Sequence, residues 1–118
     1  MRRALALFAA LALAGPADAA PGGCFWVHGR LSAYNGTPTF RIWPRGTRRL
    51  LGVVDAAGGS ETDAVLPPTV RARVLPDAFA VSVSGDFQVC PLEPDRPGRM
   101  RRVQLCDARR LVVRRDRG

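Results

Sequence analysis

The sequence predicts a small all-β protein built as one antiparallel domain. Short apolar runs recur along the chain, and each ends at a Gly, Pro, Asn or Asp residue, which is the spacing typical of an antiparallel sandwich or barrel. After the N-terminal segment, no long stretch has the apolar periodicity of a helix, and no segment repeats. The expected strands are Phe25–Ser32, Thr39–Trp43, Arg48–Val54, Thr69–Leu75, Phe79–Cys90, Met100–Cys106 and Leu111–Arg114.

The N-terminus has the order of a secretory signal peptide. Two arginines precede an apolar stretch over residues 4–14, and the small-residue triplet Ala17-Asp18-Ala19 follows. A membrane span needs about 20 apolar residues, so this stretch is too short to be one. We therefore expect residues 1–19 to be a signal peptide, removed after Ala19. The mature protein, residues 20–118, is then a single β-rich domain that is periplasmic or secreted.

The charge of the chain is strongly basic. It has 18 Arg, no Lys and 10 acidic residues, for a formal net charge of +8. A basic exported protein meets acidic polysaccharide, anionic lipid headgroups or an acidic exported protein rather than nucleic acid, so we expect a partner from these three classes and no transmembrane span. The basic C-terminal tail, Arg114 to Gly118, is expected to be frayed and solvated.

The first two strands allow a test of register. Asn35-Gly36 is a two-residue turn signal, and a hairpin closed on it places Leu31 opposite Phe40, so that the apolar faces of both strands coincide. Pro38 removes a donor from this ladder, and a wider loop is the alternative. The opposite face carries the predicted ligand-binding residues Trp26, His28, Arg30, Arg41, Trp43 and Arg45.

These aromatic and arginine side chains predict a contact surface. Planar rings offer stacking area, and arginine forks make bidentate contacts with carboxylate, sulfate or phosphate groups. The competing interpretation is that the tryptophans pack beneath a loop or another layer of the protein. We expect a binding module for an anionic or carbohydrate partner.

The segment Phe79–Cys90 has the cleanest alternation of apolar and polar residues in the chain, which predicts a strand with one buried face. Gly85-Asp86 interrupts it, which predicts a bulge or a turn at that point.

Three cysteines predict one disulfide and one remaining thiol. Cys90 and Cys106 both point away from the apolar faces of their strands, so that neighbouring strands would present both sulfurs on one face. The sequence between them is short and turn-rich, and we therefore expect a Cys90–Cys106 disulfide worth about 3 kcal/mol. Cys24 lies on an outward face too, and is expected to remain as a free thiol, an intermolecular bridge or a lipidation site.

Two pieces of the chain resemble the transthyretin-like sandwich modules found as carboxypeptidase regulatory-like domains. The first is Gly29-Arg30-Leu31 followed by Asn35-Gly36-Thr37-Pro38, and the second runs from Gly85 to Leu92 and on through Pro97-Gly98-Arg99-Met100. Met100 stands where that family has an aromatic residue. The resemblance implies a sandwich of immunoglobulin-like or transthyretin-like type that acts as a non-enzymatic binding module.

The whole chain also resembles small exported bacterial proteins of unknown function. A small open barrel of oligonucleotide-binding type is the alternative architecture, because short strands and a basic face suit it as well.

No residues predict catalysis, a cofactor or a bound metal. The cysteines and His28 have the stoichiometry of a zinc site, but no Cys-x-x-Cys pair is present. There is no Gly-x-Ser-x-Gly segment for a serine nucleophile. We therefore expect no enzyme activity. Two alternatives remain: a structural or inhibitory module that binds another exported protein through a sheet edge, and a small hydrolase or metal enzyme that uses His28.

Overall fold

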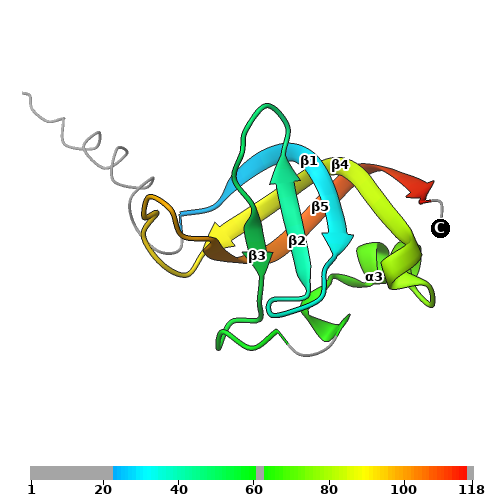
Figure 1. The fold of residues 1–118 in the computed structure, drawn as a ribbon, viewed down its shortest axis with the longest axis horizontal. Coiled ribbons are helices and arrows are strands. Elements are labelled where there is room, and N and C mark those ends of the chain that lie inside the picture. The colour runs from blue at the N-terminus through cyan, green and yellow to red at the C-terminus, as the bar shows by residue number, and fades with distance from the viewer. Residues whose placement is uncertain (1–22, 61–62, 117–118) are drawn as a thin grey trace, which may run out of the picture.

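The computed structural model describes residues 23–60 and 63–116 (Figure 1). The expected signal peptide and its cleavage site lie outside these residues. Within them, no helix is long and apolar enough to cross a membrane. The elements are β1 (Phe25–Ala33), β2 (Phe40–Pro44), β3 (Leu51–Val53), η1 (Asp63–Val65), α3 (Pro68–Val74), η2 (Ala78–Ala80), β4 (Val81–Pro91) and β5 (Arg101–Arg115).

The five strands form one mixed sheet that closes on itself. Their order is β1-β2-β3-β5-β4, and β1 pairs with β4 to complete the barrel. All pairs are antiparallel except β3 with β5, which run parallel. The all-β class predicted from the sequence is confirmed.

The core lies inside the barrel and beneath α3. In β4, alternate residues Val81, Val83, Phe87 and Val89 point inward and are buried, as the apolar alternation predicted. The helix contributes Val70 and Val74 and lies against β4 and β5 near one end of the barrel (Figure 1). The fully enclosed core side chains include Leu31, Ile42, Val53, Leu66, Val70, Val83, Phe87, Val89 and Val103.

The segment predicted as a strand over Thr69–Leu75 is the helix α3, so that prediction is wrong. Val70, Ala72 and Val74 alternate, which fits a strand, but Val70 and Val74 are also four residues apart, which fits one face of a helix. Only these two valines are buried, and Ala72 is exposed. Pro68 stands in the first turn, where a helix tolerates proline best.

The β1–β2 register differs from the prediction by two residues. Leu31 pairs with Ile42 rather than Phe40, and Tyr34 N–H donates to the carbonyl of Thr39 over 2.8 Å, which makes a wider loop. Pro38 lies within this loop, outside the ladder, which removes the conflict with its missing N–H. A shift of two residues leaves every side chain on its predicted face.

β5 is one long strand where the sequence predicted two. It includes Arg114 and Arg115, and the N–H of Asp116 donates to the carbonyl of Ala80 over 2.7 Å, so the expectation of a frayed tail is wrong for these residues. The register of its pairing with β4 shifts at two places, first between Ser84 and Asp86 and then between Gln88 and Val89. The first shift falls where the sequence predicted an irregularity in β4.

The disulfide joins Cys24 to Cys90, and Cys106 is a free thiol, so the predicted Cys90–Cys106 bridge is wrong. The reason is the strand order, because β4 lies between β1 and β5. In the β1–β4 register Phe25 pairs with Val89, which places Cys24 opposite Cys90, whereas the residue opposite Cys90 on β5 is Gln104. The Cα atoms of the bridged pair are 4.1 Å apart.

Candidate binding groove

The predicted contact residues belong to the outer surface of the barrel, and the structure divides them into three groups. Trp26 and His28 lie where β1 pairs with β4 alone. Arg41 lies on β2, beside the β1–β2 loop. The remaining three residues, Arg30, Trp43 and Arg45, line one hollow.

His28 and Trp26 contact residues of β4 and β5. In the tautomer with its proton on Nδ1, His28 donates to Asp86 Oδ1 over 2.8 Å. Arg110 donates to the other carboxylate oxygen over 3.1 Å, and the Arg109 guanidinium lies 4.1 Å from the centre of the Trp26 ring. The hydrogen bond from His28, together with the charges of Arg110 and Arg109, holds the pKa of Asp86 below its ordinary value.

Arg41 stabilises the loop that follows β1. Its guanidinium carbon lies 4.8 Å from the centre of the Tyr34 ring, and its Nε–H donates to the carbonyl of Pro38 over 2.9 Å. These contacts occupy the side chain, so Arg41 holds the loop in shape and does not line the hollow.

The groove is a hollow of about 280 Å³ lined by Gly29, Arg30, Trp43, Arg45, Ser84 and Arg114. Arg30 occupies its middle, because it pairs with Trp43 on one side and with Ser84 on the other. The Trp43 ring is held by a 2.6 Å hydrogen bond from its Nε1–H to the carbonyl of Thr47, and the Arg30 guanidinium lies 5.3 Å from the ring centre. The walls therefore come from three neighbouring strands, with Arg114 added from β5.

Gly29 allows β2 to approach β1 closely enough to form this wall. A Cβ at Gly29 would lie 2.3 Å from the carbonyl oxygen of Trp43 and 3.0 Å from the Cα of Pro44. Both atoms belong to the backbone, so no side-chain rotation relieves the contact. Glycine is therefore required here, and its absence of a side chain sets the distance between Trp43 and Arg30.

The lining of the groove carries positive charge without a neutralising partner. Arg30, Arg45 and Arg114 supply three guanidinium groups, and the lining contains no carboxylate. Over residues 23–60 and 63–116, none of these three arginines forms an ion pair, whereas Arg49, Arg102 and Arg110 each do. The groove is thus suited to an anionic group that enters from solvent.

Sequence reasoning missed Arg114 and Ser84 as members of this site. Arg114 was assigned to a solvated tail, and Ser84 to the polar face of its strand. Only the neighbouring positions of β1, β4 and β5 bring them to the groove, and the residues around them carry no local signal of it.

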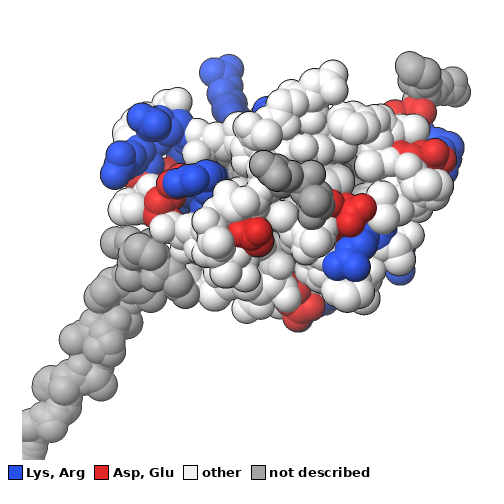
Figure 2. Space-filling view, turned by 90° about the horizontal axis from the view of Figure 1, so that it is seen from below, with Lys and Arg blue, Asp and Glu red and all other residues white. Residues whose placement is uncertain are grey.

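A larger hollow, of about 890 Å³, lies between the β1–β2 loop and the β4–β5 loop. Gly52 lies beneath it, because Pro38 and Met100 pass so close that a side chain at Gly52 would collide with both. Figure 2 shows basic and acidic side chains close together at both ends of the molecule. The lining is Thr37, Pro38, Glu93, Pro94, Arg96, Gly98, Arg99, Met100, Arg101 and Arg102.

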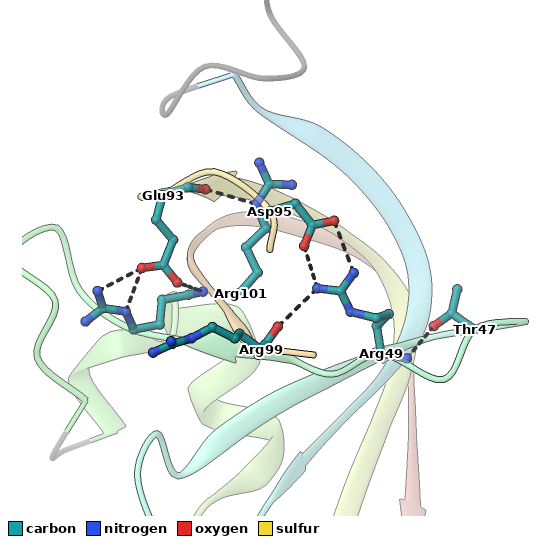
Figure 3. A network of polar contacts seen from close by, with 7 residues as sticks. Thr47, Arg49, Glu93, Asp95, Arg99 and Arg101 are labelled. Carbon is teal, nitrogen blue, oxygen red and sulfur yellow. Dashed lines mark hydrogen bonds and ion pairs between the residues drawn. The ribbon is translucent and has the colours of Figure 1, made fainter. Parts of the chain in front are cut away.

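Several charged side chains beside this second hollow form ion pairs with one another (Figure 3). Arg49 holds both oxygens of Asp95 and donates to the carbonyl of Arg99 over 3.1 Å. Glu93 accepts from the Arg102 side chain over 2.8 Å and from the Arg102 backbone N–H over 3.0 Å. Hydrogen bonds from these arginines lower the pKa of Asp95 and of Glu93. The network shapes the loop, and it places the Glu93 carboxylate in the lining of this hollow, whereas the lining of the smaller groove contains no carboxylate.

Among the residues that the structure describes, no group of three or more His, Cys, Asp and Glu side chains is placed to hold a metal ion. No family model matches the chain, and no match to it is found among curated proteins or solved structures. The resemblance to transthyretin-like modules therefore stays a prediction.

Proposed function

We propose that this protein is a non-enzymatic binding module whose groove takes an acidic group of a polysaccharide. The observation that carries the proposal is the lining of the groove, where Arg30, Arg45 and Arg114 line the same hollow as Trp43 and no carboxylate is present. Arginine forks match the geometry of carboxylate and sulfate groups. The flat face of a tryptophan offers apolar area for the ring of a sugar.

The size of the groove fits one unit of a polymer. Its volume of about 280 Å³ lies near the lower end of the range for small-molecule pockets, about 300 to 1,000 Å³. One sugar unit with its acidic substituent suits this space better than a large cofactor does. The choice of polysaccharide rests on the predicted export, because acidic polymers of this kind occur outside the cytoplasm.

Anionic lipid headgroups share the same chemistry and would be bound by the same arginines. A lipid surface is broad, however, and recruits basic residues over a whole face of a protein. The proposed partner instead occupies one hollow, so that binding depends on the groove arginines more than on total charge. The experiment below separates these two cases.

One observation favours a second candidate, a module that binds another protein through a sheet edge. β3 pairs with β5 only at Arg101, Arg102 and Val103. From there to Arg115, β5 has only β4 as a strand neighbour among the described residues. An edge of this kind accepts an added strand from a partner.

His28 is hydrogen-bonded to the carboxylate of Asp86, and this contact is what favours the hydrolase alternative. Asp86, however, is also the ion-pair partner of Arg110 and lies near Arg109, and the His28 side chain is 57% exposed. A general base must lie within hydrogen-bond reach of a bound substrate, and His28 lines neither of the two hollows described above. We therefore interpret His28 and Asp86 as part of a surface ion-pair cluster.

The test is retention of the mature protein, residues 20–118, on columns of a carboxylated and of a sulfated polysaccharide, eluted with increasing salt. Arg30→Ala and Arg114→Ala should each weaken binding about tenfold, the loss expected for one charge-assisted contact of about 1.4 kcal/mol. Arg48→Ala is the matched control, because Arg48 is exposed, forms no ion pair among the described residues and lies outside the groove.

Equal losses for Arg48→Ala and Arg30→Ala would show that binding follows total charge, as on a lipid surface, and would overturn the groove. No salt-sensitive retention of the wild type on either polysaccharide would overturn the partner class. Circular dichroism of each variant verifies that the fold is unchanged.

A further inference from the structure

All three cysteines lie together on the outer face of the barrel, where β1, β4 and β5 are neighbours. Cys90 of β4 is bridged to Cys24, which immediately precedes β1. The Cys106 sulfur lies 2.9 Å from the Cys90 sulfur. Cys90 is therefore in contact with both other sulfurs at once, bonded to one and touching the other.

The strand pairing explains why the third sulfur comes so close. Gln88 pairs with Asp107 and Val89 pairs with Leu105, so that Cys106 is the extra residue of a bulge in β5. A bulge redirects the side chain that it carries. Here it presents Cys106 to Cys90, although Gln104 is the residue directly opposite Cys90 in the ladder.

We propose that these three cysteines form a thiol–disulfide exchange site, in which Cys90 alternates between two partners. The Cys106 thiolate attacks the sulfur of Cys90, and the Cys90–Cys106 bond forms as the Cys24–Cys90 bond breaks. The electron pair of the broken bond leaves on Cys24, which takes up a proton and so balances the proton that Cys106 gave to solvent. One disulfide is lost and one is formed, so the step needs no oxidant or reductant.

The environment suits such a step. Cys24 and Cys106 are both exposed, so their protons exchange with water directly, while Cys90 is nearly enclosed at 8% exposure. Neighbouring protein atoms that desolvate the exposed Cys106 sulfur, and to a lesser degree the charge of Asp107, raise the pKa of Cys106. Since the thiolate is the attacking species, the exchange is slow at neutral pH and accelerates in alkaline solution.

The exchange changes what the surface presents. In one form the disulfide ties the start of β1 to β4, and the accessible thiol is on β5. In the other form the disulfide ties β4 to β5, and the accessible thiol is Cys24. An outside thiol reagent therefore meets a different strand in each form.

The test is direct identification of the linked pairs in the mature protein. The wild type is incubated without reductant at about pH 8, near the ordinary pKa of a thiol, then quenched and digested in acid, where exchange stops. Mass spectrometry of the peptides should find both Cys24–Cys90 and Cys90–Cys106. Finding only Cys24–Cys90, however long the incubation, would overturn the proposal.

Two variants sharpen the result. Cys24→Ser, oxidised with glutathione disulfide, should form the Cys90–Cys106 bridge within one molecule, and a folded variant that keeps both thiols reduced would contradict the proposal. Cys90→Ser should give no Cys24–Cys106 bridge within one molecule, because β4 separates their strands. Such a bridge in this variant would show that Cys90 is not the shared partner. If a variant fails to fold, the wild-type map still decides.

Discussion

The close approach of β2 to β1 at Gly29 makes the fold and the groove depend on the same residue. In Gly29→Ala, the added Cβ would lie 2.3 Å from the carbonyl oxygen of Trp43, whereas ordinary contacts begin at about 3.4 Å, so the strands must separate by about 1 Å or distort. Overpacking of this kind typically costs about 1 to 3 kcal/mol. Because the opposing atoms are backbone atoms, we expect the upper part of that range, about 3 kcal/mol.

The assay is urea denaturation followed by circular dichroism, together with polysaccharide retention of the folded variant. Gly98→Ala is the control, because Gly98 has a positive φ of 77° but nothing lies within 4 Å of the position that a Cβ would take there, so that only the backbone conformation is penalised, by about 1 to 2 kcal/mol. We expect Gly29→Ala to lose more stability than Gly98→Ala and, alone of the two, to lose retention. Wild-type stability in Gly29→Ala would refute the steric reasoning.

Two further predictions concern single polar side chains. The pKa of Asp86 is lowered chiefly by the hydrogen bond from His28. The stabilising contribution of this carboxylate is therefore present above the ordinary aspartate pKa and is lost as pH falls through the lowered value. Over that pH range, acid titration of Asp86→Asn should show a smaller loss of stability than the wild type shows, and identical titrations would contradict this. Ser82 is 2% exposed, and its hydroxyl has no hydrogen-bond partner among the described residues. Ser82→Ala should therefore be as stable as the wild type, or more stable by up to about 1 kcal/mol, in thermal denaturation. A loss of stability greater than about 1 kcal/mol would reveal a hydrogen bond from this hydroxyl to water.

The periodic elements of this barrel were predictable from local sequence. The alternation that ends at Val89 and Cys90 identified β4 and its buried face. In β1 and β2, the same alternation of inward and outward residues, called parity below, placed Arg30 and Trp43 on the outer surface. That parity was correct even though the register was wrong, because the side-chain period of a strand is two residues and the error was two residues. The same argument placed all three cysteines on the outward side of their strands, although Cys90 is nearly enclosed there.

Other features depended on which strands become neighbours. The helix α3 was missed because Val70, Ala72 and Val74 alternate as in a strand, while Val70 and Val74 are also spaced as on one face of a helix. Only the packing of this segment against β4 and β5 decides between the strand and the helix. The predicted disulfide was wrong because parity places Cys90 on a face without naming the strand beside it.

By itself, the sequence of this protein determined its all-β class, its basic charge and the outward face on which β1 and β2 carry Arg30 and Trp43. The tertiary structure decided the strand order, and with it the Cys24–Cys90 bridge and the arrival of Arg114 beside Arg30. The physical reason is that alternation along a strand is a local property, set by the direction of successive side chains. The neighbours of a strand are instead set by how the whole barrel closes over its core, to which residues far apart in the chain contribute together.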